Sequence, residues 1–221
     1  MSDGTAEIPQ QIKPASRAIS PQEFVRRGAV FFLLFALVVI FGFTQPAFIN
    51  INNLMSILQA VSVVAIIGAG VTVTLAIGGF DLSVGAVAAS SVMTASYAMI
   101  VWNLNAYETV PLVLAFGAIV GLANALLIVR LKVPDLLATL ATMFLLTGLQ
   151  LIPTAGRSIS VGLILPDGTT ATGKVDPAFL TIGRSSLFGT IPFPVILMLV
   201  VALVLHVLTA PTRLGRLLYA T

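Results

Sequence analysis

A single carboxylate interrupts a long apolar part of the sequence, within residues 78–85 (GGFDLSVG). Residues 54–77 before this stretch and residues 84–101 after it contain no charged side chain. The carboxylate of Asp81 could accept N–H groups at the start of the helix that follows. It could also face a polar cavity where glycine breaks the helix, because ionisable groups at membrane depth are usually functional. Both interpretations follow from these residue types.

The residue types give little support for a metal site, a nucleotide-binding loop or a catalytic site. The chain has no cysteine and a single histidine, His206, so thiolate and multi-histidine metal sites are excluded. The sequence of residues 168–175 is similar to that of a phosphate-binding loop. Val175, however, occupies the position at which such a loop needs a hydroxyl to bind magnesium. No span contains paired carboxylates or an activated nucleophile. We therefore expect no metal site, no cofactor and no enzymatic activity.

The composition places the chain in a membrane. Of its 221 residues, 58% are hydrophobic and only 9% are charged, against roughly a quarter charged in a soluble domain. A helix needs about 20 apolar residues to cross the bilayer. We predict an all-α, polytopic membrane helix bundle with about six transmembrane helices. The expected spans are residues 28–43, 54–77, 83–101, 110–129, 135–152 and 191–209.

The basic residues predict how the bundle is oriented. Residues 1–27 are expected to form a flexible tail, and residues 28–221 a transmembrane domain with a long external loop at 153–190. With both termini in the cytoplasm, inside segments hold 8 of the 11 basic residues, as expected for cytoplasmic loops. These residues are Lys13, Arg17, Arg26, Arg27, Arg130, Lys132, Arg213 and Arg216.

Residues 78–85 are similar to the GG-[IF]-DLSVG signature of permease subunits of bacterial sugar-type ABC importers, the ribose and xylose class. Residues 126–134, 138–142, 154–160 and 212–220 also resemble family segments, in the family's order. The resemblance covers the chain from about Phe48 to its last residue. It implies a multi-pass protein of the bacterial plasma (inner) membrane that forms the translocation pathway for a monosaccharide. The implied partners are a second permease chain, cytoplasmic ABC ATPase subunits, a periplasmic or surface-tethered sugar-binding protein and the lipid bilayer, without nucleic acid.

The resemblance and the residue types give three groups of candidate site residues. The signature group, which could line the pathway, is Gly78, Gly79, Asp81, Leu82, Ser83 and Gly85. The hydroxyl and amide side chains suited to a neutral polyol are Gln59, Ser90, Ser91, Thr94 and Asn124. The residues expected in cytoplasmic segments facing the ATPase are Arg130, Lys132, Arg213, Gly215 and Arg216.

Two alternatives stay open. In the family, the segment similar to residues 212–220 continues into an ATPase-docking helix and further spans. We therefore expect this chain to be a fragment, a truncated gene product or half of a split permease. It could then be a non-transporting remnant or scaffold. A permease of the related branched-chain amino-acid importers is the other alternative, and the DLSVG signature argues against it.

Overall fold

The computed structural model describes residues 21–209 and confirms the predicted all-α membrane bundle for that part of the chain. The chain divides into two compact units, residues 1–50 and residues 51–221. The first unit contains α1 (Pro21–Thr44). The second contains α2 (Ile51–Ala76), α3 (Val84–Ile100), α4 (Ala106–Ala125), η1 (Leu126–Arg130), α5 (Asp135–Leu149), η2 (Ile152–Thr154), α6 (Pro177–Arg184), β1 (Ser186–Leu187), β2 (Ile191–Pro192) and α7 (Phe193–Thr209).

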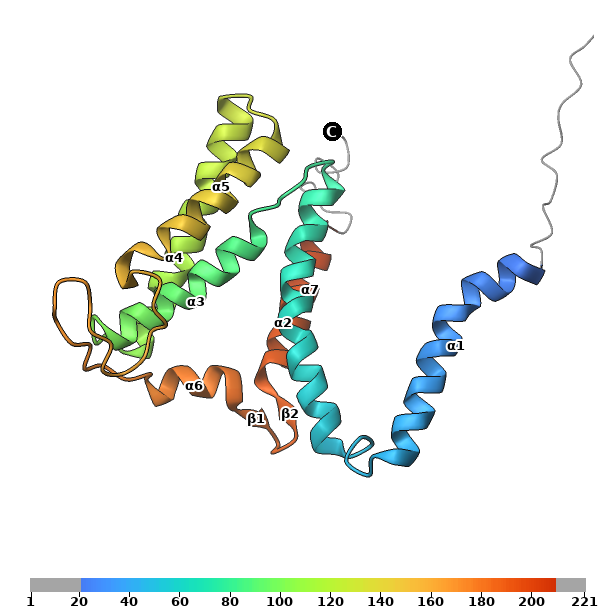
Figure 1. Ribbon diagram of the computed structural model, residues 1–221. Helices are drawn as coiled ribbons and strands as arrows, with labels where there is room; N and C mark the ends of the chain where they lie inside the picture. The colour runs from blue at the N-terminus through green and yellow to red at the C-terminus, as the bar shows by residue number, and fades with distance from the viewer. Residues whose placement is uncertain (1–20, 210–221) are drawn as a thin grey trace, which may run out of the picture. The chain divides into compact units, whose positions relative to one another are not determined.

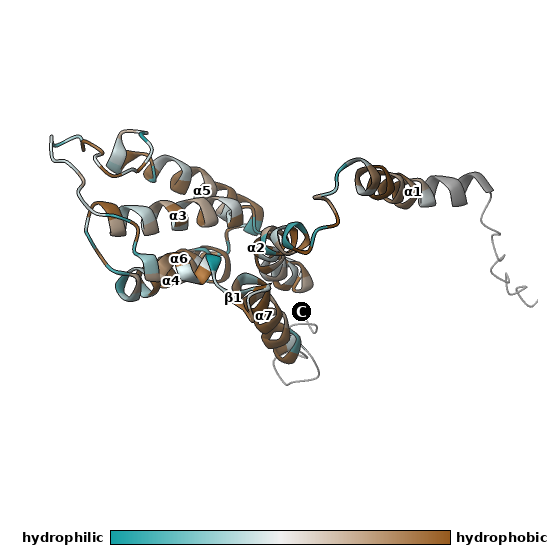
Figure 2. Ribbon diagram, turned by 90° about the horizontal axis from the view of Figure 1, so that it is seen from below, coloured by the Kyte–Doolittle hydropathy of each residue, from teal (hydrophilic) through white to brown (hydrophobic). Residues whose placement is uncertain are grey.

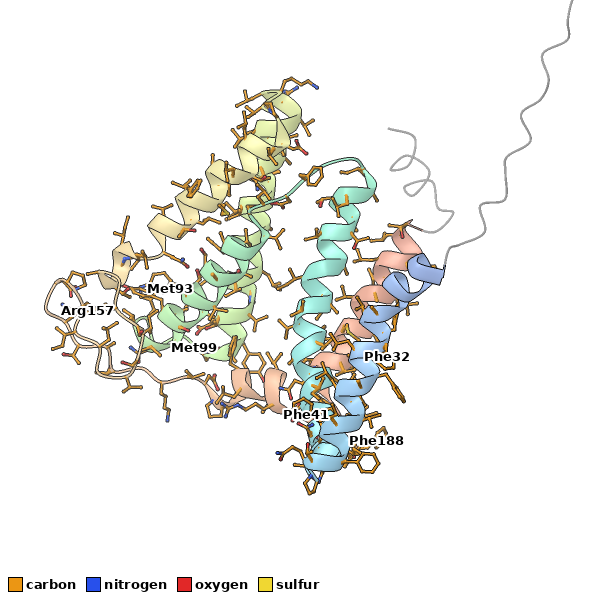
Figure 3. All side chains as sticks on the ribbon, turned by 45° about the vertical axis from the view of Figure 1, so that its right-hand side comes forward. Phe32, Phe41, Met93, Met99, Arg157 and Phe188 are labelled. Carbon is orange, nitrogen blue, oxygen red and sulfur yellow. The ribbon has the colours of Figure 1, made fainter. Side chains whose placement is uncertain are left out.

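The first unit is a helix with large apolar side chains on its surface. Phe31 and Phe32 are 74% and 75% exposed, and Phe32 is labelled in Figure 3. The Thr44 hydroxyl donates to the carbonyl of Ile40 in the last turn, at 2.8 Å. The ring of Phe41, within the helix, packs against that of Phe48, which follows the helix, with centroids 5.8 Å apart. Exposed phenylalanines of this density suit a helix that has lipid as its solvent.

In the second unit, α2 packs against α7, while α3 packs against both α4 and α5 (Figure 1). The links 77–83 and 126–134 lie toward one end of the unit, which we call the signature end. The link 101–105 and the segment 155–190 lie toward the other end, which we call the loop end (Figure 1). In Figure 2 hydrophobic residues dominate the helices, and hydrophilic residues gather mainly in the links.

Small and hydroxylated residues form much of the interior. Ala95 and Ala98 are buried, and so are the polar residues Ser62, Ser90 and Thr139. Large apolar side chains, in contrast, lie mostly on the surface. This arrangement is typical of membrane helices, whose contacts use small residues while the lipid accepts the large ones.

Helix length separates the predicted spans into two groups. The segments 51–76, 106–130 and 135–154 are each long and apolar enough to cross a membrane. The apolar helices α3 and α7 are shorter, at 17 residues each, and the apolar part of α1 covers residues 28–44. Helix α1 begins at Pro21, ahead of the predicted boundary at residue 28, with proline at a favourable first position.

A short helix, α6, lies within the segment predicted to be only a loop, across the loop end of the unit (Figure 1). One carboxylate of Asp176 starts both this helix and α4, because it accepts the N–H groups of Ala178 and Ala106, each at 2.8 Å. The hydrogen bond from Ala106, then that from Ala178, lowers the pKa of Asp176 from its ordinary value of 3.8. The carboxylate is therefore charged at neutral pH. At eight residues, α6 was too short to be distinguished from loop sequence.

Candidate functional site

Helix α2 ends at a glycine in the left-handed conformation. Gly78 has a φ of +77°, and its N–H donates to the carbonyl of Leu75 at 3.0 Å. The N–H of Gly79 donates to the carbonyl of Thr74, also at 3.0 Å. Together these bonds satisfy carbonyls that the end of a helix leaves free. Gly78 therefore sets the position at which α2 stops, because other residues are strained at this φ.

The backbone from Gly79 to Ser83 is not helical, and it runs from the end of α2 down to the start of α3 (Figure 1). We call residues 79–83 the unwound segment. Inside a bilayer, N–H groups outside a helix must find partners in the protein or in a polar cavity. The positions of those partners therefore determine whether such a segment is stable.

Helix α5 supplies two of these partners. The N–H of Phe80 donates to the carboxylate of Asp135 at 2.5 Å, and the N–H of Leu82 donates to the hydroxyl of Thr139 at 3.2 Å. Residues two apart in an extended chain are separated by about 6.6 Å and direct their N–H groups the same way. Residues four apart on a helix are separated by about 6 Å and share a face. The Asp135–Thr139 pair therefore matches the spacing of the backbone groups that it binds.

Asp81 is not the N-cap residue of α3, although it accepts an N–H group at the start of that helix, as one interpretation of the sequence expected. Ser83 is the N-cap residue, and its side chain makes no capping hydrogen bond. Instead, one oxygen of Asp81 accepts both the backbone N–H of Ser83, at 2.8 Å, and its hydroxyl, at 2.6 Å. Asp81 thus forms a local turn that fixes the residue before the helix, as aspartate often does in loops.

A chain of buried polar groups continues from Ser83 into α4 and α5. The amide of Asn124 donates to the Ser83 hydroxyl at 3.1 Å, and the hydroxyl of Thr142 donates to the amide oxygen of Asn124 at 2.5 Å. Asn124 is 7% exposed and Ser83 is 1% exposed. Thr142 lies seven residues after Asp135, which is about 10 Å along a helix. The unwound segment is therefore connected to α4 near its C-terminal end and, through Asn124, to α5 about two turns into that helix.

Asp81, Ser83 and Asn124 lie beside a cavity of about 330 Å³ between α2, α3 and α4, which we call the Asp81 cavity. Gly117 and Gly121 line it as well. Two glycines four residues apart on a membrane helix commonly let a neighbouring helix approach closely. Within the described residues, however, a Cβ atom added at either glycine would meet nothing within 4 Å. Here the small side chains leave space for the cavity.

A second cavity, of about 220 Å³, lies between α3, α4 and α5 toward the loop end, and we call it the Trp102 cavity. Its lining includes Ser90, Thr94 and Gln150, with Tyr97 and Trp102 beside them. Met93, labelled on α3 in Figure 3, also lines it. Two of the predicted pathway residues, Ser90 and Thr94, line this cavity, whereas Asn124 lines the Asp81 cavity.

An apolar cluster separates the two cavities. Its buried residues are Ala86, Val120 and Leu146, with Val87, Phe116 and Met143 packed against them. Val87 and Val120 line the Asp81 cavity, while Phe116 and Leu146 line the Trp102 cavity. This Val120 cluster therefore lies between the two cavities, among α3, α4 and α5.

The remaining predicted site residues lie apart from both cavities. Gln59 donates to the carbonyl of Gly183 at 2.6 Å and so fastens the end of α6 to α2. Ser91 is half-buried on α3 but lines neither cavity. Arg130 ends the π-helical turn η1, and Lys132 follows with a φ of +57°. Arg213, Gly215 and Arg216 lie outside the described residues.

Sequence reasoning missed the residues on α5 that complete the site. Asp135 was not among the candidate residues, and Thr139 and Thr142 lay within the segment 138–142, which was noted only for its resemblance to the family. Gln150, which lies at the end of α5, was not singled out. The spacing of Asp135 and Thr139 on one helix face was a usable indication, but it does not name the segment that they bind.

Comparisons with known proteins give a consistent set of relatives. Residues 53–221 match the family described as "Branched-chain amino acid transport system / permease component". The chain is 34% identical over 190 residues to the ribose import permease protein of Haemophilus influenzae, covering 86% of this chain and 55% of that protein. It is 34% identical over 212 residues to the Bacillus subtilis ribose import permease protein, covering 96% and 62%. It is 33% identical over 201 residues to the D-allose transport system permease protein of Escherichia coli, covering 89% and 56%.

The chain thus spans somewhat more than half the length of these curated relatives, from 55% to 62%. No solved structure matches it.

The hydrogen bonds from α5 predict a specific effect on two backbone amides. Replacing Thr139 with valine removes the acceptor for Leu82, which should cost about 1 kcal/mol and speed hydrogen exchange of that amide about fivefold. Asp135→Ala should speed exchange at Phe80, whereas Asp135→Asn retains an oxygen acceptor and should have a smaller effect. Residue-resolved hydrogen exchange of the purified protein measures each amide. Thr147→Val, an exposed threonine on the same helix, is the control. Unchanged exchange at both amides in the Thr139 and Asp135 variants would show that α5 does not hold the segment.

Proposed function

Because this chain belongs to the family of permease components of branched-chain amino acid transport systems, we propose that it is the membrane subunit of an ATP-driven importer of monosaccharides. The resemblance to sugar-type permeases is confirmed by relatives named for ribose and D-allose. The similarity to these relatives extends over most of the chain and is the observation that carries the proposal. Membership of this family also makes the chain a multi-pass protein of the bacterial inner membrane.

The two cavities favour a sugar over an amino acid as the cargo. Apart from the Asp81 carboxylate, their polar side chains are hydroxyls and amides, which suit the donors and acceptors of a polyol. Among the described residues that line either cavity there is no lysine or arginine to pair with the carboxylate of an amino acid. A buried carboxylate without a cationic partner is costly. The branched-chain amino-acid alternative therefore has less support than sugar import.

The Val120 cluster suggests how the pathway is closed in this conformation. Two cavities with polar groups, one on either side of an apolar barrier, are what a transporter needs when it exposes its cargo to one side at a time. The unwound segment lies next to this barrier, and Asp135 connects it to the link 126–134. Movement of that link would therefore be transmitted to Asp81 and Ser83.

The proposed partners follow from the proposed function as the membrane subunit of an importer. We assign the ATPase subunits to the signature end, where Arg130 and Lys132 lie, and where the segment with Arg213 and Arg216 would follow α7. A sugar-binding protein would approach the loop end, and a second permease chain would complete the pathway. In this assignment, ATP hydrolysis belongs to the partner subunits, and the permease itself is not an enzyme.

The proposed orientation has both termini in the cytoplasm and the loop end outside. Cysteine placed at Thr170, in the loop, should react with a membrane-impermeant thiol reagent added to intact cells. Cysteine placed at Gln11 should react only after the cells are opened. The chain contains no native cysteine, so the unmodified protein is the blank. Labelling of Gln11→Cys in intact cells, with Thr170→Cys unlabelled, would contradict this orientation and show the opposite one.

The transport proposal predicts uptake of a monosaccharide that depends on Asn124. The chain would be expressed with an ABC ATPase and a sugar-binding protein from its own genome, in cells lacking endogenous uptake of ribose, allose and galactose. Labelled sugar should accumulate and labelled leucine should not. Asn124→Leu leaves Ser83 and Thr142 without their buried partner, which costs about 2 kcal/mol, and should reduce uptake strongly, whereas Thr147→Val should not. Accumulation of leucine alone would favour the amino-acid alternative, and uptake of neither would contradict import by this chain.

A further inference from the structure

We propose that the Trp102 cavity is a binding subsite for one monosaccharide at the loop end of the helix bundle. This inference rests on the proposed sugar import and adds the place at which the cargo is held. It also assigns roles to Tyr97, Trp102 and Gln150, which the sequence did not single out.

Polar groups with unused hydrogen-bonding capacity line this cavity. The amide nitrogen of Gln150 and the hydroxyl of Tyr97 have no partner within the described part of the chain, although both residues are half-buried. The hydroxyl of Ser90, which is 3% exposed, donates to the Gln150 oxygen at 3.4 Å, a long hydrogen bond. A sugar hydroxyl both donates and accepts. It could therefore bind the Gln150 amide and Ser90 together.

The aromatic residues supply the apolar side of the same subsite. The rings of Tyr97 and Trp102 lie edge to face, with centroids 5.3 Å apart and planes at 86°. An aromatic face carries partial negative charge, which attracts the slightly positive C–H groups on the carbon face of a sugar ring. The cavity therefore offers aromatic rings to the apolar face of a monosaccharide, and hydroxyl and amide groups to its hydroxyls.

The size and charge of the cavity narrow the choice of ligand. Its volume of about 220 Å³ is below the range of about 300–1,000 Å³ typical for drug-sized ligands. A monosaccharide has about half as many heavy atoms as such a ligand, whereas a disaccharide would be too large. The described lining residues include no charged side chain, so the cavity suits a neutral molecule.

A lipid acyl chain is the competing occupant, because much of the cavity wall is apolar. An acyl chain, however, offers no partner to the amide nitrogen of Gln150 or the hydroxyl of Tyr97, and polar groups left unpaired in an apolar environment are costly. These two unpartnered groups therefore favour the sugar.

Trp102 is the only tryptophan in the chain, so its fluorescence reports on this cavity without any substitution. The protein in lipid nanodiscs would be titrated with ribose, allose and galactose, against sucrose as a control too large for the cavity. We expect a saturable change in Trp102 emission with at least one monosaccharide, with a dissociation constant on the order of 1 mM for so small a ligand. Sucrose should produce no saturable change.

Variants then test the individual contacts. Gln150→Leu should weaken binding about tenfold, because the amide is lost at similar volume. Tyr97→Phe, which keeps the ring, should weaken it less, and it provides the measurement if the Gln150 variant does not fold by circular dichroism. Thr147→Val, on the same helix but exposed, should bind like the parent protein.

The outcomes separate the subsite from the transport proposal. No saturable response to any of the three sugars, or binding unchanged in both Gln150→Leu and Tyr97→Phe, would overturn the subsite. Quenching by lipids brominated on their acyl chains, unaffected by sugar, would identify a lipid groove and overturn it as well. Sugar uptake without a Trp102 response would leave import standing and remove the subsite. A Trp102 response without uptake would support the subsite and contradict import.

Discussion

The need to satisfy backbone N–H groups inside a membrane is the constraint on which this structure depends. A helix satisfies its own N–H groups, but residues 79–83 leave the helix and must be satisfied by other parts of the protein. Asp135 and Thr139 accept two of these groups, and Asp81 accepts a third, from Ser83. Without these acceptors, continuing α2 as a helix would be favoured, and the cavity beside Asp81 would lose its polar wall.

The unwound segment also connects the two cavities of the proposed pathway. Ser83 begins α3, whose face carries Ser90, Thr94 and Tyr97 toward the Trp102 cavity. Asn124 on α4 joins Ser83 to Thr142 on α5, so all three helices share one buried polar connection. A fully satisfied polar network favours one arrangement of its helices over others. Opening the Val120 cluster would therefore require these helices to move together or the network to break.

Much of the fold could be predicted from the sequence, because uninterrupted apolar runs such as 54–77 permit little besides membrane helices. The turn at Gly78 was also predictable, since two glycines precede a carboxylate. The contacts of Asp135 and Thr139 were not, because Phe80 lies 55 residues before Asp135 and one sequence does not reveal such pairs. The role of Asp81 was predicted only in part: it accepts an N–H group at the start of α3, but Ser83 lies between it and the helix and is the N-cap residue.

The central claim is that residues 79–83 form a non-helical segment held by α5, and spin-label accessibility across residues 72–90 tests it most directly. Nitroxide labels would be attached one at a time to single cysteines, which is simple in a chain without native cysteine. The structure predicts helical periodicity up to Ala76 and again from Val84. Between them, labels at Phe80 and Leu82, which are 57% and 42% exposed, should be mobile, and a label at buried Ser83 immobile. An unbroken period of about 3.6 residues through the whole range would contradict the account.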